Sequence, residues 1–233
     1  MARTKSNSLG PNLSTSEQVA GFCYLPFFVF LLQWLLRYCS DLFGLGFTAL
    51  QLSVAKYVIN CAVVWIIFRR FLTSSFRAIR FWELVQAVIL GLALYVAGKV
   101  VLDLVLKLLK QSAPSYNADL VMALPTNNRW ITWICCLVLT PVVEETLFRG
   151  LIFGTIRRKS RIAAYIVMVL AFAAVHIWRQ FASVGIVGIL LAAVPYLPAG
   201  VAFGWTYEKS NTIWAPIVLH MAVNAFSLGL LHF

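Results

Sequence analysis

Two adjacent acids and an arginine, Glu144, Glu145 and Arg149, lie in an otherwise strongly apolar segment of the chain. If that segment crosses a membrane, its charged groups are costly unless they face a bundle interior or a wet cavity, so they mark a functional site. On a helix Glu145 and Arg149 share a face and can neutralise each other. Glu144 points about 100° away from Glu145. It is therefore free to face a cavity as an unpaired carboxylate that can take a proton from water.

Two histidines occur in later apolar segments, each with a partner four residues away. Phe172 precedes His176 and His220 precedes Asn224, so on helices each pair shares a face. A lone histidine in an apolar helix is more often a satisfied core residue than a catalytic one. At about 1.5 Å of rise per residue, however, Glu144, His176 and His220 fall at similar depths in their helices. We therefore expect these three side chains to meet in one layer.

A carboxylate and two imidazoles can activate water in two ways. Glu144, His176 and His220 could ligate a metal such as zinc, or Glu144 could act as a general base while the histidines polarise a carbonyl. Asn224 could donate a hydrogen bond to a developing oxyanion. The sequence has neither the HExxH motif of zincins nor the GxSxG elbow of serine hydrolases. These residues indicate a hydrolytic site and leave its metal content open.

The composition predicts a membrane protein. Of the 233 residues, 61% are hydrophobic and 12% are charged, whereas soluble domains are roughly half apolar and a quarter charged. A soluble fold could not bury that much apolar surface. We therefore expect an all-α protein, a polytopic bundle of transmembrane helices.

Seven apolar runs are long enough to cross a hydrocarbon core, which needs about 20 helical residues. They lie near residues 19–38, 45–68, 82–106, 131–156, 161–178, 183–206 and 211–232. Pro195 and Pro198 could divide the sixth run into two helices, giving eight spans. Pro141 could break the fourth run and begin a half-helix whose N-terminal dipole favours carboxylates. We expect a polar tail at 1–18 and one membrane domain at 19–233.

The net charge of +11 does not indicate nucleic-acid binding, because the basic residues form no stripe interleaved with exposed aromatics. They form short clusters between apolar runs, as cytoplasmic loops do. The two clusters are Arg69, Arg70, Arg77 and Arg80, and Arg157, Arg158, Lys159 and Arg161. With seven spans, this distribution predicts a cytoplasmic N-terminus. We expect a multi-pass protein of a bacterial cell membrane.

The three polar motifs, taken in order, resemble those of the CPBP family of intramembrane metalloproteases, which includes the type II CAAX prenyl endopeptidases and the Abi bacteriocin-immunity proteins. The motifs are Glu144-Glu145-xxx-Arg149, Phe172-xxx-His176 and His220-xxx-Asn224. The flanking Phe148-Arg149-Gly150, Tyr207-Glu208-Lys209 and Trp214-Ala215-Pro216-Ile217 are also similar to that family. The resemblance covers about residues 130–230 and leaves the first three helices unassigned.

The resemblance implies a role for each motif residue. Glu144 would activate the water, while His176, His220 and Asn224 would bind a metal or stabilise the oxyanion. Glu145 and Arg149 would orient the site, in agreement with their predicted pairing. The residues do not decide whether such a protein needs zinc or acts as a glutamate-dependent protease without metal.

The leading functional hypothesis is an intramembrane endopeptidase that acts on a membrane-associated peptide or protein, with the lipid bilayer as its environment and no nucleic-acid partner. A non-catalytic immunity or regulatory protein on the same scaffold is the first alternative. A proton-coupled transporter is the second, because buried Glu and His can relay protons. The inverted repeats typical of transporters are absent from the sequence, which favours the peptidase over the transporter.

Overall fold

The computed structural model describes residues 10–113 and 129–229, and no β-strand occurs in these two ranges. The first helices are α1 (Thr15–Pro26), the π-helical η1 (Phe27–Leu31), α2 (Leu32–Leu42), α3 (Ala49–Arg77) and α4 (Phe81–Leu108). The second range begins with α6 (Arg129–Ile134), η3 (Cys135–Leu139), α7 (Thr140–Glu145), η4 (Thr146–Phe153) and α8 (Gly154–Arg157). It continues with α9 (Arg161–Ile177), η5 (Trp178–Gln180), α10 (Ile186–Ala193), η6 (Val194–Tyr196), α11 (Leu197–Ser210) and α12 (Trp214–Ser227).

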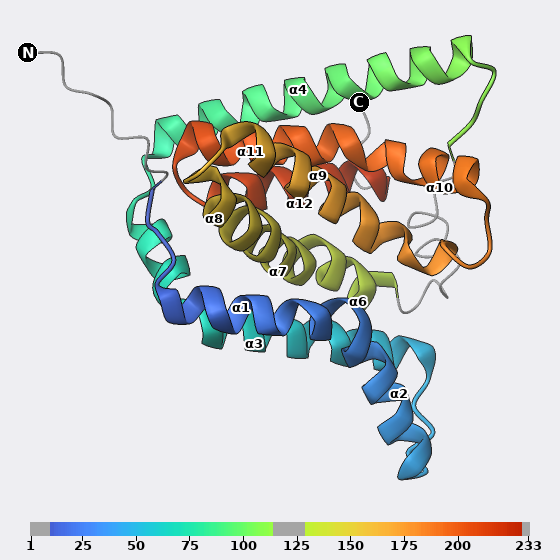
Figure 1. The fold of residues 1–233 in the computed structure, drawn as a ribbon. Coiled ribbons are helices and arrows are strands. Elements are labelled where there is room, and N and C mark those ends of the chain that lie inside the picture. Colours follow the sequence, from blue (N-terminus) through green and yellow to red (C-terminus); the bar gives the residue numbers. More distant parts are fainter. Residues whose placement is uncertain (1–9, 114–128, 230–233) are drawn as a thin grey trace, which may run out of the picture.

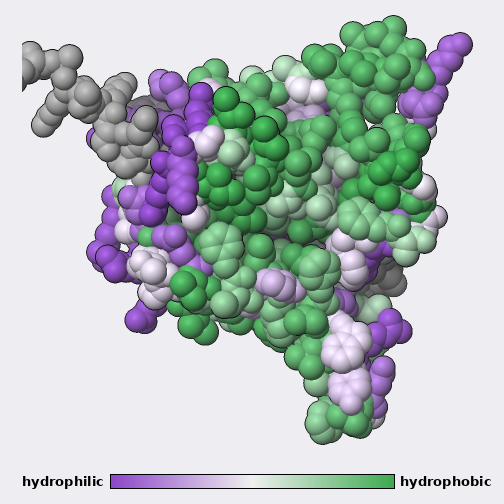
Figure 2. Space-filling view, viewed as in Figure 1, coloured by the Kyte–Doolittle hydropathy of each residue, from purple (hydrophilic) through white to green (hydrophobic). Residues whose placement is uncertain are grey.

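Five continuous helical stretches are long and apolar enough to cross a membrane. They are Thr15–Leu42, Ala49–Arg77, Phe81–Leu108, Arg161–Gln180 and Ile186–Ser210. Apolar side chains cover much of the visible surface, and polar ones gather at one end of the bundle (Figure 2). The predicted polytopic helical bundle is confirmed, and two further helical stretches, 129–157 and α12, complete it.

The long helices run roughly side by side (Figure 1). α4 packs along α11 and α12 on one side, and α1 packs on α3 at the opposite side. The helical stretch from α6 to α8 lies between these layers, where α7 contacts α3 and α12 and η4 contacts α9. α2 and the start of α3 extend away from the rest of the molecule.

The helix starts follow local capping chemistry. A capping box begins α1 at Thr15, within the segment expected to be a polar tail: the Ser14 hydroxyl accepts from the backbone N–H of Glu17, and the Glu17 carboxylate accepts from that of Ser14. The other carboxylate oxygen of Glu17 accepts from the backbone N–H of Phe71, at 3.0 Å. The acid that begins α1 therefore also fixes α1 against α3.

The helix does not break at Pro141, so the predicted half-helix and its dipole are not formed. The backbone is α-helical at Leu139 (φ −70°, ψ −45°) and at Thr140 (φ −61°, ψ −50°). A proline inside an α-helix lacks an N–H and crowds the carbonyl four residues earlier. The wider π-helical turns of η3 directly precede Pro141 and relieve that conflict, so the chain stays helical from α6 to α8.

The prolines of the sixth run cause a local change of helix type and no separation into two helices. A single 3-10 turn, η6, joins α10 to α11, and Pro195 lies inside it. Pro198 occupies the first turn of α11, where its missing N–H costs nothing. The stretch from Ile186 to Ser210 is therefore one continuous helical segment.

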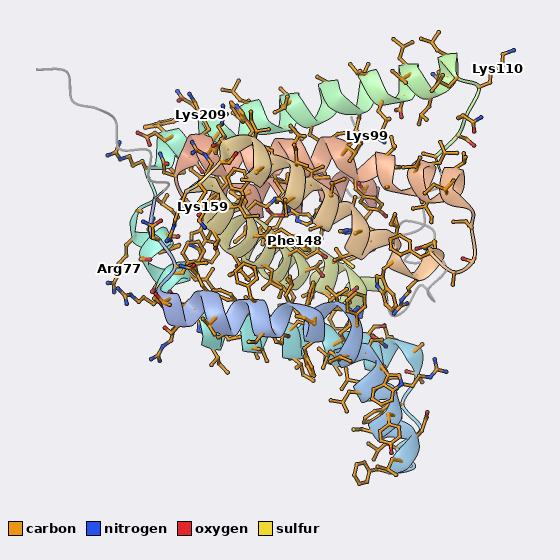
Figure 3. The ribbon with its side chains drawn as sticks, in the orientation of Figure 1. Arg77, Lys99, Lys110, Phe148, Lys159 and Lys209 are labelled. Carbon is orange, nitrogen blue, oxygen red and sulfur yellow. The ribbon has the colours of Figure 1, made fainter. Side chains whose placement is uncertain are left out.

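The core of the bundle surrounds η4, in which every residue is buried. Phe148 lies at the centre of the molecule, as Figure 3 shows. Gly150 lets α3 approach η4, because a Cβ at that position would lie 2.9 Å from the Phe71 ring. Gly204 likewise lets α11 approach α9, because a Cβ at that position would lie 2.7 Å from Cε of Met168. Within residues 10–113 and 129–229, the π-helical segment that is wholly buried is thus the one that follows the two acids.

Candidate active site

A buried cluster of charged groups joins η4 to α12. Arg149 Nη1 donates to Glu145 Oε1 at 3.0 Å, and both side chains are fully buried, so the predicted i, i+4 pair is confirmed. The same Glu145 oxygen lies 2.7 Å from Nδ1 of His220. A carboxylate oxygen only accepts, so Nδ1 of His220 carries the proton. This fixes the ring orientation and leaves Nε2 of His220 as the nitrogen available to reacting groups.

Aromatic rings enclose the arginine of this cluster. The Arg149 guanidinium lies 4.3 Å from the ring centroid of Phe172 and 5.1 Å from that of Phe203. Its Nη2 also donates to the Gly200 carbonyl at 3.4 Å. A guanidinium stacks on aromatic faces more favourably than an ammonium does. Arg149 is therefore fixed by one carboxylate, one carbonyl and two rings.

The other acid, Glu144, faces His176. Glu144 Oε2 lies 3.7 Å from Nε2 of His176, and among the described residues this buried oxygen accepts no hydrogen bond. Nδ1 of His176 lies 2.7 Å from the Phe172 carbonyl and so must donate to it. In the neutral ring Nε2 is then an acceptor. A separation beyond hydrogen-bond distance between a carboxylate and this nitrogen suits a bridging water.

Asn224 contacts the widened helix that precedes the acids. Its Nδ2 donates to the backbone carbonyl of Cys136 at 2.9 Å. Cys136 lies in η3, where π-helical turns shift the usual backbone pairing. An amide nitrogen carries two protons, so this contact positions Asn224 and leaves one N–H for another acceptor.

A cavity of about 550 Å³ opens onto these groups and is lined by Glu144, His176, His220 and Asn224. Lys56 and Arg179 also line it, and both are cations that the sequence alone did not place at the site. A second cavity of about 560 Å³, toward α4, shares the two histidines and Asn224 but is not lined by Glu144. Of these two cavities, the one of about 550 Å³ therefore gives access to the Glu144 carboxylate.

The predicted metal ligands do not gather into a metal site. Glu144 and His176 face each other, and the bond from Nδ1 of His220 to Glu145 leaves Nε2 of His220 free. Within residues 10–113 and 129–229, no three His, Cys, Asp or Glu side chains are grouped so that they could hold a metal ion. We therefore assign no catalytic step to a metal ion.

Comparison with known proteins finds similarity in the second half of the chain. Residues 126–226 match the family model described as type II CAAX prenyl endopeptidase Rce1-like, and all six candidate residues fall inside the match. The match covers less than half of the chain, and in this region the chain is similar to the Rce1-like family. This similarity agrees with the resemblance drawn from the three motifs. Helices α1 to α4 lie outside the match.

Two curated bacterial proteins are similar to the chain. UPF0177 protein YxdF of Lactococcus lactis is 32% identical over 89 residues, which cover 38% of this chain and 44% of that protein. A Bacillus subtilis protein named "Putative membrane peptidase YdiL" is 28% identical over 109 residues, covering 46% of this chain and 38% of that protein. The matched region thus spans less than half the length of either relative. No solved structure matches the chain.

Proposed function

We propose that this protein is an intramembrane endopeptidase in which Glu144 activates a water molecule. The observation that carries the proposal is the free Oε2 of Glu144, which faces Nε2 of His176 across 3.7 Å at the edge of a cavity. A water between them donates one proton toward each. Its oxygen lone pair is then directed at a carbonyl entering from the cavity.

The chemical step uses Glu144 as base and then as acid. The water oxygen bonds to the scissile carbonyl carbon while its proton passes to Glu144, and the carbonyl oxygen becomes an oxyanion. Collapse of that intermediate breaks the carbon–nitrogen bond, and Glu144 returns its proton to the leaving amine. The products are a new carboxyl terminus and a new amino terminus.

The remaining polar groups position the reactants. Asn224 borders the cavity, and its remaining N–H can donate to the oxyanion. His220 lies four residues earlier on α12, and its Nε2 can donate there only when the ring carries a second proton. Glu145 and Arg149 are fully buried and touch no substrate, so they are positioning residues that hold the His220 ring. The substrate we infer is a membrane-associated peptide or protein segment, because the cavity lies between membrane helices.

The bundle end that carries the basic clusters is proposed to face the cytoplasm. Arg77, Lys159 and Lys209 lie together at this end, whereas Lys110 lies at the opposite end (Figure 3). Loops rich in Lys and Arg stay on the cytoplasmic side of membranes. The start of α1 is at the same end, which supports a cytoplasmic N-terminus.

Glu144→Gln tests the enzymatic proposal. In purified protein, cleavage of fluorogenic peptides ending in a CAAX sequence, prenylated and unprenylated, is expected to fall at least about 100-fold, as loss of a general base does. Glu83→Gln is the matched control, because Glu83 is an exposed acid that pairs with Arg80 on α4. Wild-type cleavage by Glu144→Gln protein would overturn the proposal and favour the non-catalytic scaffold.

A further inference from the structure

A third cavity lies away from the candidate active site, at the basic end of the bundle. It has a volume of about 670 Å³ and is bounded by the α8–α9 connection and the last turn of α11. Its lining contains Trp205, five cationic side chains and one carboxylate; the charged residues are Arg157, Arg158, Lys159, Arg161, Lys209 and Glu208. None of these residues has a role in the proposed peptidase mechanism.

The single carboxylate organises part of this lining. Glu208 Oε1 accepts from Nε of Arg157 at 2.5 Å, and Glu208 Oε2 accepts from Nη2 of Arg161 at 2.9 Å. The Tyr165 hydroxyl donates to the same Oε2 at 2.7 Å. Glu208 therefore holds two guanidinium groups from two elements in fixed positions. Each guanidinium has five N–H donors, so most of them remain for a ligand.

The other three cations are not neutralised in this way. Arg158, Lys159 and Lys209 are exposed and form no ion pair within the part of the chain that the structure describes. Lys159 and Lys209 come from different elements yet lie at the same end of the bundle (Figure 3). Like charges held around one concavity repel each other, and an anion placed there relieves the repulsion.

The surface next to the cavity is apolar, which favours a lipid over a soluble anion. Ile162 directly follows Arg161 and is 75% exposed, and Ile166 is the next exposed residue on that side of α9. On α11, Val201 stands one turn from Trp205 and is also exposed. A molecule with its anionic group in the cavity would thus have its tails against Ile166 and Val201. Tryptophan at this boundary is typical of the headgroup level of a bilayer.

We propose that this cavity is a binding site for the phosphate headgroup of an anionic phospholipid. Arg157 and Arg161, fixed by Glu208, contact the phosphate oxygens, and the exposed cations of the α8–α9 connection and of Lys209 surround it. The bound lipid bridges α8, α9 and α11, the elements that carry or adjoin His176 and the Arg149 pocket. The site is independent of the peptidase proposal.

Native mass spectrometry of the purified protein, titrated with phosphatidylglycerol or phosphatidylcholine, tests the site. Phosphatidylglycerol is expected to remain bound and phosphatidylcholine to dissociate. The double variant Arg158→Gln/Lys159→Gln is expected to weaken phosphatidylglycerol binding about 30-fold, because each basic residue near an anionic lipid contributes a factor of roughly five. Arg69→Gln/Arg70→Gln removes two exposed charges of α3 outside the cavity and is expected to leave binding unchanged.

Three results would overturn the proposal. Equal retention of the two lipids would show that charge does not select the ligand. An equal loss in the Arg69→Gln/Arg70→Gln control would show that only total charge matters. Displacement of the lipid by inorganic phosphate at equal concentration would identify a soluble phosphate site. All four substituted residues are exposed, so a thermal unfolding scan close to that of the wild type is expected for both variants.

Discussion

At the scale of single residues, the two neighbouring acids have opposite environments. Glu145 is fully buried between Arg149 and His220, whereas Glu144 has a buried oxygen that accepts no hydrogen bond among the described residues and lines a cavity. Rotation by about 100° between consecutive helical residues produces this difference. One acid therefore maintains the structure of the site, and the other is free to exchange a proton.

Neutralising the two acids is expected to have unequal effects on stability. Glu145→Gln leaves the Arg149 guanidinium buried without its counter-charge, so it should destabilise the fold by about 3 kcal/mol or more. Glu144→Gln breaks no hydrogen bond and should change stability little. Thermal unfolding of both variants in the same detergent measures the difference. Equal unfolding temperatures would contradict the assignment of Glu145 as the structural acid.

Asn224→Ala tests whether the Asn224 side chain donates a hydrogen bond to the oxyanion. Loss of one side-chain donor to an oxyanion lowers kcat by about 100- to 1000-fold in hydrolases, and we expect a decrease of that size with KM nearly unchanged. The variant also loses the hydrogen bond to the Cys136 carbonyl, so Asn224→Asp, which keeps an acceptor but no donor in its ionised form, is measured beside it. Steady-state kinetics in which Asn224→Asp kept wild-type kcat would exclude the donor role.

At the scale of elements, the sequence predicted contacts within a helix better than contacts between helices. The Glu145–Arg149 pair follows from helical geometry alone, because residues four apart share a face. The bonds from Glu145 to His220 and from Asn224 to the Cys136 carbonyl depend on how α12 is rotated against α7 and η3. No periodicity in one segment encodes that rotation, so these contacts could not be predicted.

The continuity of the helices at their prolines likewise could not be predicted from residue types alone. Pro141 is a helix breaker in isolation, and its effect is cancelled by the π-helical turns of the preceding Cys135–Leu139 segment. Pro195 and Pro198 similarly alter one turn and leave a continuous stretch. The apolar runs themselves located the helices well, because a run long enough to cross a bilayer has one stable backbone conformation there.

The close packing of α4 on α11 predicts that a larger side chain at Gly91 destabilises the protein. A Cβ at Gly91 would lie 2.0 Å from Oγ1 of Thr206 and 2.7 Å from Cδ2 of Leu219. Gly91→Leu is therefore expected to destabilise the protein by about 1–3 kcal/mol through overpacking. Ala93→Leu adds a similar side chain on an exposed position of the same helix and should be neutral. Urea or thermal unfolding in detergent compares the two, and equal destabilisation would contradict the close α4–α11 packing.

At the scale of the whole molecule, polarity is arranged along the bundle as well as across it. The candidate active site lies in the interior, between helices whose outward faces are apolar, and the basic clusters gather at one end (Figures 2 and 3). The interior position limits access to substrates that enter from the bilayer or through the cavities beside α12. The charge asymmetry in turn is the basis of the proposed orientation in the membrane.

The two ends of α3 provide a direct test of orientation. This helix has 29 residues, or about 43 Å at 1.5 Å per residue, so its flanking connections lie on opposite sides of a membrane. Ala78 follows it at the basic end, and Leu45 precedes it at the other; both are exposed. With the five native cysteines replaced by alanine, Leu45→Cys should react with a membrane-impermeant maleimide on intact cells. Ala78→Cys should react only after permeabilisation, because basic connections remain cytoplasmic. The reverse labelling pattern would invert the proposed topology, and labelling of both sites on intact cells would show that α3 does not span the membrane.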